Sequence, residues 1–171
     1  MKLWLPILAF VTLMAASAAY FFFGTGVLPD RIAVHFAADG SPNGFSTREE
    51  YRHFLLVFGL GVPLAAALCV AVLPNLLPAA LINLPNKDYW LAPERRAQSM
   101  LYLGAHGFWL GCLLLLLMCG VHALVASANA AAAAGQHLAG STFLWVLGGF
   151  FAGMAAWAVT LMLRFRRPPA I

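Results

Sequence analysis

The five histidines are the first candidates for metal binding or proton transfer in this sequence. His35 and His53 lie in one polar segment together with Asp39, and His137 lies in a second polar segment. Imidazole and carboxylate groups of this kind bind zinc, but their spacing matches no standard zinc site. We therefore expect no metal and no cofactor. A cluster around His35 that fixes the loop or contacts a partner is the simpler interpretation.

Two further histidines, His106 and His122, lie within one apolar segment. A helix separates them by about 24 Å and turns them to nearly opposite faces, so they cannot share a metal. Each is expected to be an interhelical hydrogen-bonding group or an interface residue. The H-E-x-x-H, G-x-S-x-G and P-loop patterns are also absent. We therefore expect no enzyme; a membrane enzyme that uses His35 and Asp39 is the alternative.

A polar, turn-rich stretch, LPDRIAVHFAADGSPNG at 28–44, interrupts the apolar sequence. Its RIAVHF part alternates, which predicts a short strand with Ile32 on one face and Ala33 on the other. The DG at 39–40 and the PNG at 42–44 predict turns, because glycine accepts a positive φ and proline presets its own φ.

A capped helix is expected after these turns. Ser46 and Glu49 fit a capping box, in which each side chain bonds a backbone N–H of the other residue. Residues 24–53 are therefore predicted to be an ordered outer loop between two spans. Its candidate contacts to a ligand or partner are Asp30, Arg31, His35, Asp39, Gly40, Pro42 and Asn43.

The composition requires a membrane around this chain. Hydrophobic residues make up 63% of the 171 residues and charged residues only 9%, with a mean hydropathy of +0.84. A soluble domain carries about 25% charged residues, so there is too little polar surface here for a water-soluble fold. The net charge of +4 is therefore interpreted by position, and we expect no nucleic-acid partner.

Four uncharged apolar segments are long enough to cross a bilayer as helices. The predicted spans are about 3–23, 54–73, 100–125 and 143–163. We expect an all-α membrane protein: one integral membrane domain, 1–171, built as a four-helix bundle. The first segment also imitates a secretory signal, but its apolar sequence continues far enough to span. In the second, Pro74 and Pro78 are expected to end or kink the helix.

The positive charges predict the orientation. All ten Lys and Arg residues lie outside the predicted spans: seven beside the termini and the 83–99 loop, and three in the 24–53 loop. Positive charge is retained in the cytoplasm, so both termini are expected there, in a multi-pass protein of the bacterial inner membrane. Because no charged residue lies within a span, ion-coupled transport is disfavoured.

The second polar stretch, LPNKDYWLAPERRAQ, belongs to the inner loop at 83–99. Pro93 and Glu94 favour a helix start there. The segment is interpreted as a helix start with a cationic anchor for anionic lipid, or as a docking site for a cytoplasmic protein. The residues that carry this interpretation are Asn86, Lys87, Tyr89, Trp90, Pro93, Glu94, Arg95 and Arg96.

Small residues predict where helices approach closely. Gly104, Gly107 and Gly111 share one face of the third span, and Gly149 and Gly153 form a G-x-x-x-G in the fourth. These faces favour helix packing and could support a homo-oligomer. The alanine-rich run that begins at residue 129 is expected to be a short outer connection, helical up to residue 135.

The outer stretch resembles a known family pattern, L-P-D-x-I-P-x-H-[FW]-x-x-x-G-x-P-[DN]-x-[FWY]. This is the pattern of the domain of unknown function 1648 family, a domain that also opens the SdpI-type immunity proteins of bacteria. The matching residues are Leu28, Pro29, Asp30, Ile32, His35, Phe36, Gly40, Pro42, Asn43 and Phe45. Ala33 stands where the family usually has proline. LPNKDYWLAPERR also resembles a second motif of many small members.

The resemblance implies an integral membrane protein without defined catalytic residues. SdpI-type members protect against a secreted peptide toxin and can recruit a repressor to the membrane, but they carry further spans that this sequence does not match. We therefore expect a non-enzymatic protein whose outer loop recognises an extracytoplasmic peptide or small ligand, and whose inner loop signals or anchors. The alternative is an accessory subunit of a transporter or of an envelope-maintenance complex.

Overall fold

The computed structural model describes residues 3–37, 40–134 and 140–166. Four helical stretches in it are long and apolar enough to cross a membrane, as predicted. They are α1 (Trp4–Gly26), the continuous run α2 (Arg48–Phe54), η1 (Leu55–Gly59) and α3 (Leu60–Ala71), then α6 (Pro93–Ala133) and α7 (Gly140–Phe165). The strands are β1 (Arg31–Phe36) and β2 (Pro42–Thr47), and the short helices are α4 (Leu73–Leu76), η2 (Ala79–Leu81) and α5 (Lys87–Trp90).

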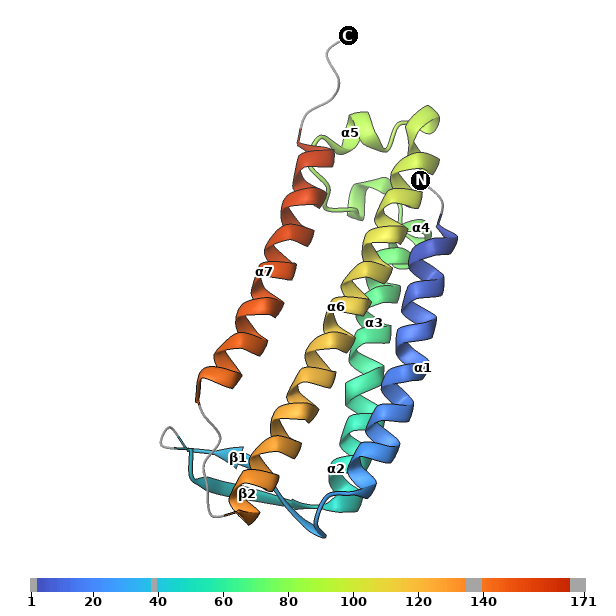
Figure 1. The fold of residues 1–171 in the computed structure, drawn as a ribbon. Coiled ribbons are helices and arrows are strands. Elements are labelled where there is room, and N and C mark those ends of the chain that lie inside the picture. Colours follow the sequence, from blue (N-terminus) through green and yellow to red (C-terminus); the bar gives the residue numbers. More distant parts are fainter. Residues whose placement is uncertain (1–2, 38–39, 135–139, 167–171) are drawn as a thin grey trace.

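Helix α6 is the central element of the fold. It packs against α3 and α1 on one side and against α7 on the other, and it runs between them in Figure 1. Helix α7 packs on one side only, because no residue from Thr142 to Arg164 is buried. The arrangement is therefore three closely packed helices with a fourth laid along α6.

The glycine face predicted on the third span is the contact between α6 and its neighbours. A Cβ atom on Gly107 would lie 2.7 Å from the carbonyl oxygen of Ala67, and one on Gly111 would lie 2.5 Å from the ring of Phe10. Backbones approach this closely only where side chains are absent. On α7 the prediction holds in part: Gly153 faces Leu113, while nothing lies within 4 Å of a Cβ on Gly149.

The second span contains a π-helical turn, η1, just before an internal proline. Pro63 lacks an N–H, and its ring would collide with the carbonyl of Gly59 four residues earlier. The π-helical turn ends at Gly59 and widens the helix where this collision would occur. The predicted helix end before Pro74 is confirmed, because α3 ends at Ala71 and only the short helix α4 follows.

Two of the helices extend beyond the apolar spans, as the predicted helix starts require. Helix α6 begins at Pro93, ahead of the predicted span at 100–125, and its 41 residues reach Ala133. The helix that leads into the second span begins at Arg48. Helix was also predicted up to Gly135, but α6 ends at Ala133, and Gly135 lies outside the described residues.

The two ends of the molecule carry different structures. The hairpin of β1 and β2 crosses one end, which we call the hairpin end (Figure 1). Both described chain ends, together with α4, η2 and α5, lie at the opposite end, which we call the termini end. The two polar loops of the sequence are therefore separated by the length of the helices.

The close approach at Gly107 gives a direct test of the packing around α6. We expect Gly107→Ala to lower the free energy of unfolding by about 1–3 kcal/mol, because the added methyl group overpacks against backbone atoms of α3. Thermal unfolding in mild detergent measures the change. Gly148→Ala is the matched control, since nothing lies within 4 Å of a Cβ there. Equal melting temperatures for the two variants would contradict this packing.

Candidate functional site

The outer motif folds into an antiparallel hairpin rather than a strand followed by two turns. The strand prediction is confirmed by β1, and the first turn contains Gly40 with a φ of 83°; Asp39 lies outside the described residues. The second predicted turn, residues 42–44, was wrong because these residues begin β2. Gly44 is needed there for a close approach between strands, since its Cβ would lie 2.8 Å from the Cβ of His35.

The capping box is present, but one residue later than predicted. Thr47 Oγ1 accepts a hydrogen bond from the backbone N–H of Glu50 (3.2 Å), and Glu50 Oε2 accepts one from the N–H of Thr47 (2.9 Å). The predicted pair, Ser46 and Glu49, was wrong because β2 continues through Thr47 before the helix begins. The box joins the hairpin rigidly to the second span.

Polar contacts close the base of the hairpin, between the residue before β1 and the residue after β2. Asp30 Oδ1 accepts a hydrogen bond from Arg48 Nη2 at 2.6 Å, and the backbone N–H of Arg48 donates to the carbonyl of Asp30 at 3.0 Å. Because the Asp30 side chain is exposed, this ion pair contributes only about 0–1 kcal/mol. Further along, the guanidinium of Arg31 lies 4.1 Å from the ring centre of Phe45.

Asn129 near the end of α6 holds β1 in place. Its Oδ1 accepts from the backbone N–H of Ala33 and its Nδ2 donates to the Ala33 carbonyl, both at 2.9 Å. The same Nδ2 also donates to the carbonyl of Val125 at 2.8 Å, which fixes the side chain against its own helix. The amide therefore pairs with β1 as a neighbouring strand would. Ala33 is consequently buried, although the alternation placed it on the face opposite Ile32.

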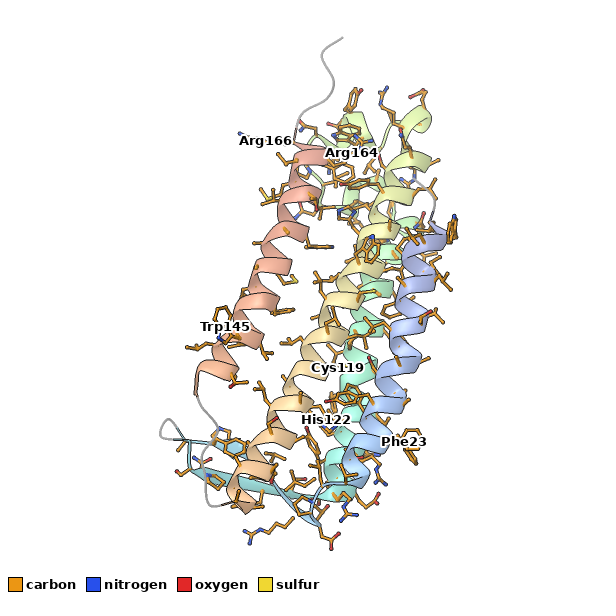
Figure 2. All side chains as sticks on the ribbon, in the orientation of Figure 1. Phe23, Cys119, His122, Trp145, Arg164 and Arg166 are labelled. Atoms are coloured by element: carbon orange, nitrogen blue, oxygen red, sulfur yellow. The ribbon has the colours of Figure 1, made fainter. Side chains whose placement is uncertain are left out.

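A buried polar group lies directly beneath the hairpin. The side chain of His122 on α6 is 1% exposed, and its Nδ1 lies 3.2 Å from the hydroxyl of Tyr51 on α2. Gly24 on α1 makes room for the ring, because a Cβ there would lie 2.6 Å from His122 Nε2. Figure 2 shows His122 pointing between α6 and α1. The prediction that His122 forms an interhelical hydrogen bond is confirmed.

His106 plays the equivalent part on the opposite face of α6. Its Nε2 lies 3.4 Å from Thr160 Oγ1 on α7, and its carbonyl accepts from the indole N–H of Trp157 at 2.9 Å. The two histidines therefore bind different neighbouring helices, as their spacing predicted. Both side chains serve packing in this structure.

Both strands of the hairpin carry exposed side chains. His35 Nδ1 is hydrogen-bonded to Asn43 Oδ1, and both side chains are exposed. Pro42 is exposed as well, and Phe45 is 47% exposed. The described site residues thus divide into two groups: Asp30 and Gly40 help to shape the hairpin, while the others are exposed, namely Arg31, His35, Pro42 and Asn43.

Residues 83–99, which we call the inner segment, supply hydrogen-bond donors to the end of α7. Asn86 has a left-handed backbone (φ 51°), and its Nδ2 donates to the carbonyls of Phe165 (3.1 Å) and Arg166 (2.8 Å). The indole N–H of Trp90 donates to the Phe165 carbonyl at 3.2 Å. The last carbonyls of a helix lack intrahelical partners, and these two residues supply them. Trp90 is only 4% exposed, so its ring is covered by the protein itself.

The cations of the inner segment bond to backbone carbonyls. Lys87 Nζ donates to Ala80 O at 3.3 Å, Arg95 Nε to Tyr89 O at 2.8 Å and Arg96 Nη2 to Leu77 O at 3.1 Å. Arg95 also lies 4.0 Å from the ring centre of Tyr89. The predicted helix start is confirmed, with Pro93 as the first residue of α6 and an exposed Glu94 in its first turn.

The candidate metal ligands can be compared only in part, because Asp39 and His137 lie outside the described residues. Across residues 3–37, 40–134 and 140–166, no three His, Cys, Asp or Glu side chains come together as a metal site would require. Among the described residues, His35 is paired with the amide of Asn43. The geometry of the described residues is that of an ordered surface, and the hairpin is the candidate functional site.

Sequence reasoning missed the residues that hold the hairpin in place. Asn129 stands in an alanine-rich run that was interpreted only as a connection, although a lone amide in such a run is a recognisable signal. Tyr51 was missed because only folding brings it to His122. Strand β2 was missed because its PNG residues also suit a turn.

The Asn129 contact predicts how the hairpin is lost. We expect Asn129→Ala to leave the backbone groups of Ala33 without partners, at a cost of about 1–3 kcal/mol per buried group. The hairpin should then open at least about fivefold more often. Trypsin cleavage after Arg31 measures the opening. Asn75→Ala is the control, because Asn75 bonds only Ala71 at the termini end. Wild-type cleavage rates in Asn129→Ala would contradict the contact.

Comparison with known proteins places the hairpin in a family. Residues 7–60 match the family model described as Domain of unknown function (DUF1648). The match contains most of α1, the whole hairpin, α2 and η1. It stops before the inner segment, so the likeness of LPNKDYWLAPERR to a second motif stays a prediction. The comparisons with curated proteins and with solved structures found no match. This chain therefore carries, in residues 7–60, a domain of the DUF1648 family.

Proposed function

We propose that this membrane protein recognises an extracytoplasmic peptide or small ligand with its hairpin, without catalysing a reaction. The observation that carries the proposal is the contrast within the hairpin. Its backbone is fixed to the second span by the capping box and to α6 by Asn129, while His35, Pro42 and Asn43 stay exposed. A rigid support beneath exposed polar groups lowers the entropy lost on binding.

Strand β2 offers an edge to which a peptide can add. The backbone N–H and C=O of Ala33 both bond Asn129, so they point away from β2. Ala33 is opposite Phe45 in the register, and in such a non-hydrogen-bonded pair the backbone groups of both residues point outward. The outer edge of β1 is thus covered by α6, and that of β2 is where an extended peptide would bind.

The side chains beside this edge define a ligand class. The Arg31–Phe45 pair presents a cation over an aromatic ring, and the His35–Asn43 pair presents an imidazole and an amide. Together they suit a peptide with polar or acidic side chains next to an apolar one. Immunity against a secreted peptide toxin is one form that such recognition could take.

The proposed orientation places the hairpin outside the cytoplasm and the termini inside, in the bacterial inner membrane. The termini end has the described cations Lys87, Arg95, Arg96, Arg164 and Arg166, whereas the hairpin end has Arg31, Arg48 and Arg52. The hairpin cations are also partly neutralised, by Asp30 and Glu49. Excess positive charge on one side supports a cytoplasmic location for that side.

Site-specific photo-crosslinking in living cells tests recognition and orientation together. A photoreactive residue in place of Asn43 should capture an extracytoplasmic peptide or protein, because the side chain is exposed beside β2. The same probe in place of Val27 is the control, since Val27 is 86% exposed near the same end but lies outside the hairpin. Equal capture at both positions would contradict recognition by the hairpin, and capture of a cytoplasmic protein would reverse the orientation.

A second function, as an accessory subunit of a larger membrane complex, is favoured by α7. This helix buries nothing between Thr142 and Arg164, and its hairpin-proximal part exposes Leu144 (67%) and Trp145 (81%). Figure 2 shows Trp145 on the side of α7 away from α6. A stable complex in mild detergent that Trp145→Arg disrupts would support this function, and recovery of the wild-type chain alone would count against it.

A further inference from the structure

An apolar groove lies at the termini end, between the second span and α7. Its volume is about 360 Å³, within the roughly 300–1,000 Å³ of small-ligand pockets. One wall comes from the end of the second span and α4, and the other from α7. The residues that matter for the argument are Cys69, Leu73 and Leu77 on the first wall and Leu161, Met162 and Phe165 on the second.

A polar cavity adjoins this groove. Its volume is about 400 Å³, and its polar lining residues are Asn83, Asn86, Lys87 and Asp88. The chain segment 81–84 lines both cavities, so an apolar and a polar compartment share one thin wall. Asn83 lines both cavities, and its side chain forms no hydrogen bond with the rest of the described residues. A ligand with an apolar part and a polar part would fit this pair.

Among the described residues of this end, cations outnumber carboxylates, although the lining of the polar cavity itself holds one of each, Lys87 and Asp88. Among the described residues, this end carries the cations Lys87, Arg95, Arg96, Arg164 and Arg166 and the carboxylates Asp88 and Glu94. Within residues 3–37, 40–134 and 140–166, neither carboxylate forms an ion pair, and the two ion pairs present both lie at the hairpin end. Lys87, Arg95 and Arg96 bond carbonyl groups, and Arg164 lies over an aromatic ring. None of these described contacts compensates their charge.

We propose that these cavities form a binding site for one anionic phospholipid. An acyl chain occupies the groove between Leu73 and Met162, which opens between two bilayer-spanning helices. The phosphate lies in the polar cavity, where Lys87 supplies charge and Asn83 a hydrogen-bond donor. A helix from another protein would fill the groove but would leave the polar cavity and its charge without a partner. The site is separate from the hairpin and does not depend on what the hairpin binds.

Native mass spectrometry of the full chain in mild detergent tests the site. The probes are phosphatidylglycerol and phosphatidylcholine with identical acyl chains. We expect phosphatidylglycerol to bind about fivefold more tightly, the ratio that one interfacial cation provides. Lys87→Gln should bring the ratio close to one. Cys69→Trp should weaken both lipids at least about fivefold, because the indole fills the groove.

Matched controls separate the site from general lipid contact. Leu68→Trp places the same indole on the neighbouring exposed residue of α3, which does not line the groove. Arg31→Gln removes an exposed cation at the hairpin end. Both should bind lipid as the wild type does. Melting temperatures verify folding, and Asn83→Leu replaces Lys87→Gln if that variant unfolds. Equal binding of the two lipids by the wild type, or unchanged binding by Cys69→Trp, would overturn the proposal.

Discussion

The two hydrogen bonds between Asn129 and the backbone of Ala33 decide what the outer motif can do. A two-stranded hairpin alone is marginally stable in water, and here it lies at the end of a helix rather than on a sheet. Asn129 supplies the missing strand-like contact, and α6, which carries it, also carries His122 beneath the hairpin. The exposed His35–Asn43 pair is therefore held at a constant position relative to the bundle.

The termini end follows the same logic with other residues. Helix α7 packs on α6 alone among the long helices, so its end needs partners from elsewhere. Asn86 and Trp90 provide them by bonding the last carbonyls of α7, and Arg164 packs 4.1 Å above the Trp90 ring. The first role of the inner segment is therefore to hold the end of α7. Because these contacts use carbonyl groups and aromatic rings, the positive charges of this end stay available to a lipid.

Much of the fold could be predicted from the sequence, and the reasons are local. Apolar length defined the four spans, alternation defined β1, and Pro93 defined the start of α6. What failed depended on contacts distant in sequence. The cap moved from Ser46 to Thr47 because β2 pairs one residue further with β1, and Asn129 acquires its role only when β1 lies beside α6. Trp90 was predicted to contact lipid or a partner protein, but its ring packs against the end of α7 and is 4% exposed.

Hydrogen exchange at the Ala33 amide of the wild-type protein in bilayer nanodiscs tests the central claim most directly. If the segment around Ala33 were a loose loop, its amide hydrogen would exchange at nearly the unprotected rate. Our account predicts protection close to that of the α6 core, because the N–H is buried and bonded to Asn129. Exchange at Ala33 as fast as in an unstructured peptide would show that the hairpin is not held by α6, and would contradict the account.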